Sequence, residues 1–165
     1  MSHSLVLKPE TAPFDSVAVW GIPLARVDYD GAVELVQQRI ADGRPGFFIT
    51  ANLQYAMLCD REPRLQEVNQ RAAFRLADGM PMVWFSRLLG RPLPGRVTGA
   101  DLIYRLCQRA AERRWPAFFL GGAPGSAEAA AAELRRRYPG LIVAGAEAPQ
   151  MDDLSPEEHD ALADR

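Results

Sequence analysis

The chain has 165 residues, of which 48% are hydrophobic and 24% charged, and its 19 basic and 21 acidic residues give a net charge of -2. This length fits one domain with a buried core, and the composition excludes a disordered chain. The near balance of charge gives no general attraction to nucleic acid, so we expect no nucleic-acid partner.

The N-terminal part of the chain predicts a lead-in, a hairpin and a helix. Residues 1–14 are expected to be a flexible lead-in, because prolines interrupt regular structure there. Two short apolar strands follow at 17–20 and 24–27, joined as a β-hairpin through residues 21–23. Asp28 or Asp30 then begins a helix whose apolar residues recur at helical spacing.

The rest of the chain alternates strands with helices. The pattern predicts strands at 47–50, 74–77, 117–120 and 141–144, and helices after Asn52 and at 63–72, 80–89, 101–113 and 127–138. Such alternation implies right-handed βαβ crossovers. The predicted fold class is therefore α/β, with a Rossmann-like, mainly parallel sheet, helices on both of its faces and the hairpin in front.

The expected domain organisation is the lead-in followed by a single α/β domain over residues 15–165. Ser155 and Glu158 have the spacing of a capping box and open one more helix. A chain that stops just inside a helix has the pattern of a domain truncated at its C-terminus.

Polar residues and glycines lie at the C-terminal ends of three of the predicted strands: Thr50 with Asn52, then Asp78, then the Gly121-Gly122 pair. Ligands of an open parallel sheet bind beyond the carboxyl ends of its strands, so we expect these residues to converge.

Asp78 has two interpretations. It is either the N-cap of the helix at 80–89 or a carboxylate held at the lip of a cleft. Pro81 has no amide to offer, which removes one donor that a capping aspartate would bind.

Three other parts of the sequence also have more than one interpretation. The GGAPGS stretch at 121–126 could hold phosphate with its amides, or be an ordinary tight turn, since it matches neither the dinucleotide nor the P-loop fingerprint. Asp28 and Asp30 have the D-x-D spacing of metal-dependent sugar-nucleotide enzymes, but they precede a periodic helix, so we interpret them as helix-start acids. Arg96, on a loop rich in Pro and Gly, suits a bidentate hold on phosphate or is a solvated arginine.

A set of motifs occurs in a fixed order along the chain. They are T-x-N at 50–52, A-D-G-x-P at 77–81, L-x-x-R-V-x-G-x-D at 93–101, F-L-G-G-x-P-G at 119–125 and Y-P-G-L at 138–141. Together they resemble the WecG/TagA/CpsF family of bacterial glycosyltransferases, over about residues 17–150.

The resemblance implies an inverting transfer that needs neither a metal nor a cofactor. The expected donor is a UDP-sugar of N-acetylmannosamine or a related hexose, and the expected acceptor is a polyprenyl-diphosphate-linked sugar of cell-envelope polysaccharide synthesis. The protein would work at the cytoplasmic face of the membrane, which it would contact through a C-terminal part that family members have beyond this chain.

The resemblance also assigns roles to residues. It implies that Asp78 is the general base, that Thr50 and Asn52 line the same pocket, and that Arg96 contacts the acceptor or its phosphate. The remaining substrate-binding residues expected from the motifs are Gly79, Gly99, Asp101, Gly121 and Gly122.

Two further questions stay open at the level of sequence. A non-catalytic sugar-nucleotide-binding or interaction module on the same fold is the alternative function, whereas an oxidoreductase is disfavoured because the dinucleotide fingerprint is missing. The helix at 80–89 is apolar on nearly every side, so it is either wholly buried or partly an interface, for a second copy or for the lipid acceptor.

Overall fold

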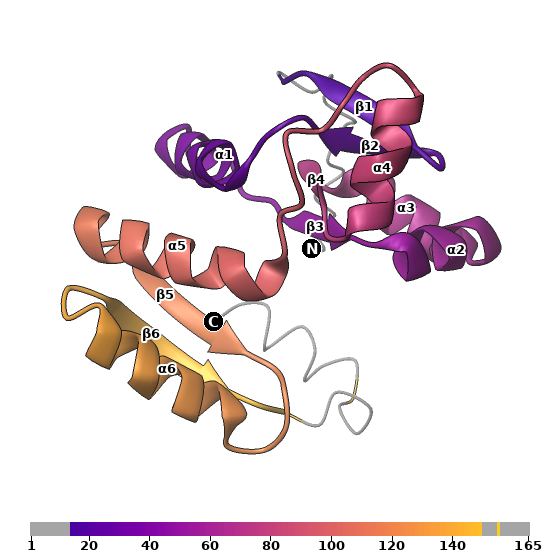
Figure 1. The fold of residues 1–165 in the computed structure, drawn as a ribbon. Coiled ribbons are helices and arrows are strands. Elements are labelled where there is room, and N and C mark those ends of the chain that lie inside the picture. The colour runs from indigo at the N-terminus through magenta and orange to yellow at the C-terminus, as the bar shows by residue number, and fades with distance from the viewer. Residues whose placement is uncertain (1–13, 150–154, 156–165) are drawn as a thin grey trace. The chain divides into compact units, whose positions relative to one another are not determined.

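The computed structural model describes residues 14–149 and Ser155 (Figure 1). The chain divides into two compact units, with the division between Ile103 and Tyr104. The predicted lead-in, except Phe14, and most of the predicted capping box at 155–158 lie outside the described residues, and the single-domain organisation stays a prediction.

The first unit begins with an antiparallel hairpin of β1 (Ser16–Val19) and β2 (Ile22–Ala25), as predicted. Its turn is Trp20 and Gly21, with φ of 47 and 77, the left-handed pair of values that two-residue hairpin turns favour. The Trp20 ring stacks on Phe85 with 4.9 Å between ring centroids. The turn thus begins one residue earlier than expected and is fixed by an aromatic contact.

Helix α1 (Tyr29–Ala41) follows the hairpin, and Asp28 is its N-cap, because the Asp28 carboxylate accepts a hydrogen bond from the Gly31 amide at 2.9 Å. The role of Asp28 as a helix-start acid is therefore confirmed.

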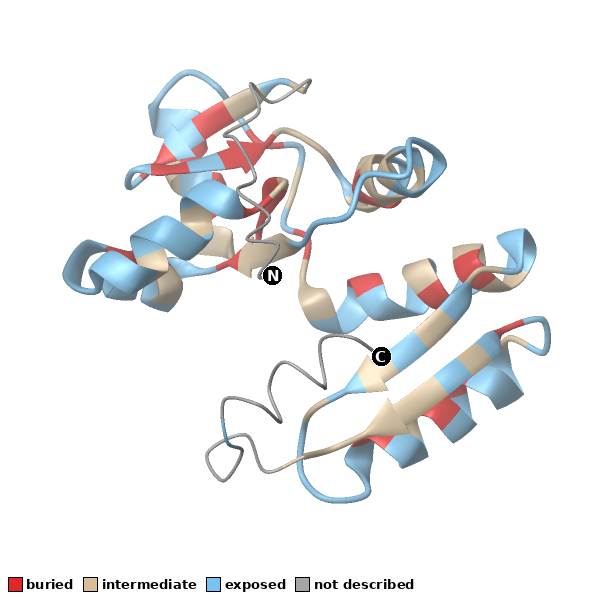
Figure 2. Cartoon of the chain, turned by 180° about the vertical axis from the view of Figure 1, so that it is seen from behind, coloured by how far each residue is buried: buried red, intermediate tan, exposed pale blue. Residues whose placement is uncertain are grey.

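Two parallel strands form the centre of the first unit. They are β3 (Phe48–Ala51) and β4 (Phe74–Ala77), and they are connected through α2 (Leu53–Arg61) and α3 (Pro63–Arg71). All four residues of β4 are buried, as in a strand covered on both faces. Figure 2 shows how buried residues gather in the strands of this unit; the cluster consists of Val17, Val19, Ile22, Leu24, Ala51, Ala56, Ala77, Met82 and Leu93.

Helix α4 (Met80–Leu88) starts directly after β4 and is buried on one side only. Met82, Val83 and Ser86 are buried, whereas the side chains of Trp84 and Leu88 are 57% and 81% exposed. The alternative of a wholly buried helix is therefore wrong, and an interface role stays a prediction.

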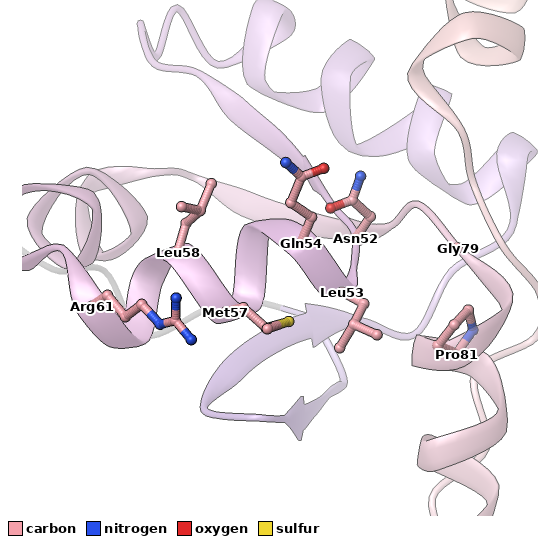
Figure 3. Close-up of a pocket in the computed structure, with 8 residues that line it drawn as sticks. All are labelled: Asn52, Leu53, Gln54, Met57, Leu58, Arg61, Gly79 and Pro81. Atoms are coloured by element: carbon pink, nitrogen blue, oxygen red, sulfur yellow. The ribbon is translucent and has the colours of Figure 1, made fainter.

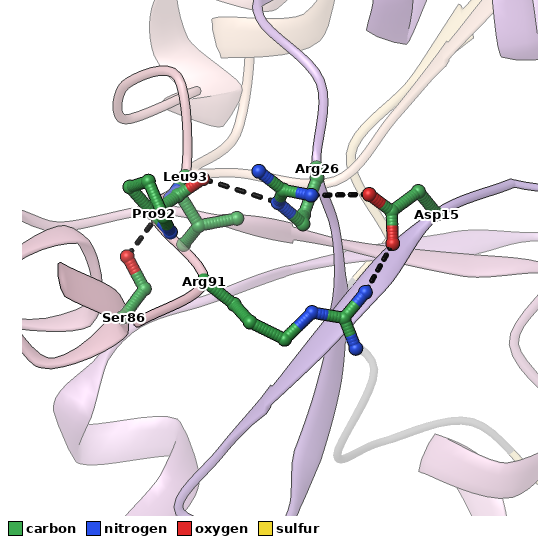
Figure 4. Close-up of polar contacts among 6 residues, drawn as sticks. All are labelled: Asp15, Arg26, Ser86, Arg91, Pro92 and Leu93. Atoms are coloured by element: carbon green, nitrogen blue, oxygen red, sulfur yellow. Dashed lines mark hydrogen bonds and ion pairs between the residues drawn. The ribbon is translucent and has the colours of Figure 1, made fainter. Parts of the chain in front are cut away.

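The loop from α4 to α5 is anchored in the protein interior by Ser86 (Figure 4). The Ser86 hydroxyl donates to the carbonyl of Val83 at 2.7 Å and accepts from the amide of Leu93 at 2.9 Å. Ser86 and Leu93 are both buried. One hydroxyl thus ties the helix to the loop that follows it.

The same loop is anchored at the surface by an ion-pair network (Figure 4). Asp15 pairs with both Arg26 and Arg91, and the Arg26 Nε donates to the carbonyl of Pro92 at 3.1 Å. The side chains of Asp15 and Arg91 are more than half exposed. Such pairs are screened by water and salt, so the buried anchor should contribute more to stability.

The second unit contains the parallel pair of β5 (Pro116–Leu120) and β6 (Ile142–Glu147), connected by α6 (Ser126–Arg137). Helix α5 (Gly99–Arg113) enters this unit at Tyr104. A buried cluster of Cys107, Ala110, Leu134 and Leu141 joins the two helices to the strands.

The α/β fold class, the leading hairpin and the parallel pairing are confirmed. Strands β3 and β4 form the parallel pair of the first unit, and β5 and β6 form that of the second. None of the described helices has the combination of length and apolar character that a bilayer crossing needs.

Candidate active site

Asp78 is the first residue after β4, and main-chain hydrogen bonds fix its position. Its amide donates to the carbonyl of Ala51 at 2.9 Å, and the carbonyl of Ala77 accepts from the amide of Val97 at 2.7 Å. Asp78 is therefore held between the end of β3 and the loop that leads to α5.

The Asp78 carboxylate does not cap the helix that follows it. Gly79 is the N-cap of α4, and no side chain makes a capping hydrogen bond there. Instead, Asp78 Oδ2 accepts from the amide of Gly99, the first residue of α5, at 3.3 Å. The capping interpretation is wrong for α4, and the other oxygen, Oδ1, has no hydrogen bond to any described residue.

Thr50 lies against the same glycine. A Cβ atom added to Gly99 would lie 3.4 Å from Thr50 Oγ1, so the threonine side chain packs on the Gly99 backbone. The structure thus brings together Thr50, Asp78 and Gly99 from three separate motifs. That separation is ordinary van der Waals contact, so position 99 touches Thr50 without a steric clash.

Asn52 and Gly79 line a pocket beside Asp78. Asn52 is the N-cap of α2, as predicted, and its Oδ1 accepts from the Tyr55 amide at 2.8 Å. A Cβ on Gly79 would lie 3.8 Å from the Cβ of Asn52. The pocket has a volume of about 530 Å³ (Figure 3) and is lined by Asn52, Leu53, Gln54, Met57, Leu58, Arg61, Gly79 and Pro81.

Asp101 positions the start of α5 rather than lining this pocket. Its carboxylate Oδ2 accepts from Thr98 Oγ1 at 2.8 Å and from the Tyr29 hydroxyl at 3.0 Å. The Thr98 amide in turn donates to the Tyr29 hydroxyl at 3.1 Å. This cluster fixes the chain next to Gly99 and therefore the amide that binds Asp78.

Tyr29 was not among the site residues predicted from the sequence. Its role depends on contacts with residues about 70 positions away, and no local pattern reveals such contacts. Within residues 14–149 and Ser155, no three His, Cys, Asp or Glu side chains gather where they could hold a metal ion.

Arg96 is exposed on the loop before α5, and it forms no hydrogen bond or ion pair with the described part of the chain. Its neighbour Val97 is bound to Ala77, so the arginine backbone lies close to the end of β4. The guanidinium is therefore available to an anionic ligand, and that role stays a prediction.

Gly121 and Gly122 follow β5 in the second unit, and their place at the same site as Asp78 stays a prediction. Both have left-handed φ values, 102 and 87, and a Cβ on Gly122 would lie 2.3 Å from Ser126 Oγ. The geometry of the turn by itself therefore requires glycine at position 122.

Comparison with known proteins supports the family resemblance. The family model described as "Glycosyl transferase WecG/TagA/CpsF family" matches residues 17–165. A relative from Bacillus spizizenii is an N-acetylglucosaminyldiphosphoundecaprenol N-acetyl-beta-D-mannosaminyltransferase, and it is 33% identical to this chain over 99 residues. That match covers 60% of this chain and 38% of the relative, so it spans much less than two thirds of the relative's length.

Proposed function

This chain belongs to the WecG/TagA/CpsF family of glycosyl transferases, and we propose that it provides the catalytic base of an inverting transferase. The proposed reaction moves N-acetylmannosamine or a related hexose from a UDP-sugar to a sugar linked by diphosphate to a polyprenyl lipid. The family match supports the reaction class, and the activity for which the Bacillus relative is named supports the sugar and the acceptor. Such a step extends a precursor of a cell-envelope polysaccharide or an exopolysaccharide.

The placement of Asp78 carries the proposal. One carboxylate oxygen is held by the Gly99 amide, while the other is left without a protein donor within the described ranges, beside the pocket lined by Asn52 and Gly79. A base must be fixed in position and must also have a free oxygen for the proton that it takes. Asp78 meets both requirements.

The proposed step forms one bond at the anomeric carbon of the donor sugar and breaks another. The acceptor hydroxyl gives its proton to Asp78 as its oxygen forms a bond to the anomeric carbon, from the face opposite UDP. The bond between that carbon and the diphosphate oxygen breaks, and its electron pair leaves with UDP. A positioned base contributes about 10²- to 10⁴-fold to the rate of such a step.

The departing diphosphate carries negative charge that the site must stabilise. Guanidinium groups and main-chain amides can do so, and we assign Arg96 and the Gly121-Gly122 turn to this role or to the acceptor phosphate. We assign no metal and no cofactor to the reaction. A lipid-linked acceptor stays in the bilayer, so the protein would work at the cytoplasmic membrane surface.

The test is turnover of UDP-N-acetylmannosamine with a lipid-diphosphate-linked N-acetylglucosamine acceptor, followed by chromatography of the product. We expect Asp78→Asn to lose at least about a hundredfold in kcat while its affinity for UDP, measured by calorimetry, stays the same. Asp60→Asn, on the exposed surface of α2, is the matched control and should keep full activity.

Two outcomes would argue against the proposal. Full activity of Asp78→Asn would remove this residue from the base role. A wild-type protein that binds UDP-sugar without any turnover would favour the non-catalytic binding module.

A further inference from the structure

We propose that an exposed apolar surface on α2 and α4 binds the polyprenyl chain of the acceptor. This α2–α4 surface consists of Leu53 and Met57 of α2 and Pro81, Trp84 and Leu88 of α4. The inference rests on the proposed function and deepens it, because it places the lipid part of the substrate.

The α2–α4 surface is continuous with the pocket beside Asp78. Pro81 lines that pocket together with Leu53 and Met57 (Figure 3). Trp84 and Leu88 follow Pro81 three and seven positions later, so they lie on the same side of α4. The surface therefore extends from the pocket for about 10 Å along the helix axis.

Helix α4 exposes large apolar side chains in addition to those that it buries. Met82 and Val83 are buried and Phe85 packs against the core, yet Trp84 and Leu88 face solvent. Met57 of α2 is also more than half exposed. A contiguous apolar surface of this kind marks an interaction site rather than the chance exposure of one side chain.

The charges around the surface favour an amphiphile with an anionic head. The pocket lining has the guanidinium of Arg61 and the carboxamides of Asn52 and Gln54, but no carboxylate. Arg87 is exposed between Trp84 and Leu88 in sequence. Arginine and tryptophan at the border of an apolar surface suit a ligand that is apolar at one end and charged at the other.

The position of the surface also fits the reaction. Asn52 and Gly79, at one end of the pocket, adjoin Asp78, so a lipid chain on α4 leads its head group toward the base. An isoprenoid chain needs only apolar contact, which α4 supplies, while its diphosphate and sugar need the polar groups near Asn52. The two ends of the acceptor thus match the two ends of the surface.

The test compares two acceptors with the same sugar diphosphate, one on an undecaprenyl chain and one on a short, water-soluble alkyl chain, both in detergent. For the double variant Trp84→Ser/Leu88→Ser we expect KM for the long acceptor to rise about tenfold or more, the result of losing two apolar contacts. Its kcat, and its kcat/KM for the short acceptor, should stay within about twofold of wild type. Ile40→Ser, an exposed apolar residue of α1, is the matched control and should change neither.

Several results would overturn the inference. An equal defect with both acceptors would place the two residues at the sugar, the diphosphate or the donor. If the variant shows no defect in detergent but shows one when the assay is repeated with the acceptor in liposomes, the surface binds the bilayer. Unchanged kinetics would exclude a lipid contact, and a loss of oligomers by light scattering in the same variant would mean that a second copy covers the surface.

Failure of the proposed function gives a different result. Wild-type protein would then turn over neither acceptor. Calorimetric binding of a polyprenyl diphosphate in detergent, compared between wild type and the double variant, still decides the lipid site. Equal affinity of the two proteins would refute it.

Discussion

Replacing Ser86 with alanine should lower the free energy of unfolding by about 1–3 kcal/mol, because a buried amide loses its acceptor. The Ser86 side chain is 0% exposed, and its hydroxyl accepts from the Leu93 amide at 2.9 Å. Water cannot take the place of that hydroxyl without opening the core, so the variant carries the full desolvation penalty of the Leu93 amide. Urea unfolding followed by circular dichroism measures the difference, provided that the slope with denaturant stays the same.

The surface anchor of the same loop is the internal comparison. Arg91→Ala breaks the ion pair between Arg91 and Asp15, whose two side chains are 55% and 53% exposed respectively. We therefore expect the free energy of unfolding to fall by only about 0–1 kcal/mol. Salt at about 1 M shortens the screening length to about 3 Å and should remove this smaller difference while leaving the Ser86→Ala effect. A Ser86→Ala variant as stable as wild type, or less affected than Arg91→Ala, would refute the reasoning.

Three other perturbations test other parts of the structure. Tyr29→Phe removes the donor to Asp101, so we expect a stability loss of about 1 kcal/mol and a fall in kcat larger than any change in KM; an unchanged kcat would exclude a positioning role. Gly122→Ala places a Cβ atom 2.3 Å from Ser126 Oγ, at a position where φ is 87. We therefore expect the free energy of unfolding in urea to fall by more than about 1 kcal/mol. An unchanged free energy of unfolding would show that the turn relaxes. Burial raises the pKa of Tyr55 from 10.0 to about 12, because the folded protein disfavours the charged phenolate. The contribution of Tyr55 to the free energy of unfolding is therefore fully present below pH 10 and is lost as the pH rises toward 12. Tyr55→Phe should remove that part of the pH dependence of unfolding, and an unchanged pH profile would contradict the assignment.

Local patterns in the sequence predicted the order of the elements well. The strand at 74–77 is found with the predicted bounds, and Asn52 caps α2 as expected. A short apolar run or a capping residue depends on neighbours within one turn, so the chain itself contains the information. The strand predicted at 141–144 is longer, because its pairing with β5 continues it to Glu147.

Contacts between distant residues could not be predicted in this way. Asp78 accepts a hydrogen bond from the amide of Gly99, and Asp101 accepts one from the hydroxyl of Tyr29. Both hydrogen bonds form only when the first unit folds. The resemblance to a family indicated which motifs belong to one site, but it did not reveal that Gly99 lies against Thr50.

The exposure of α4 is a second feature that composition leaves open. A helix with apolar residues on nearly every side has no polar side to mark where solvent lies. The structure resolves this, because the buried side is the one that packs on the hairpin and β4, and Trp84 and Leu88 are left outside.

The way in which Asp78 is anchored allows the shape of the pocket to change while the position of the carboxylate stays the same. Its contacts come from the main chain of Ala51 and Gly99, which every sequence possesses, whereas the neighbouring pocket is formed largely by the side chains of α2. Substitutions on α2 can therefore reshape the pocket without displacing the carboxylate. Exchange of that helix alone is a direct route for an engineer to alter which ligands the protein accepts.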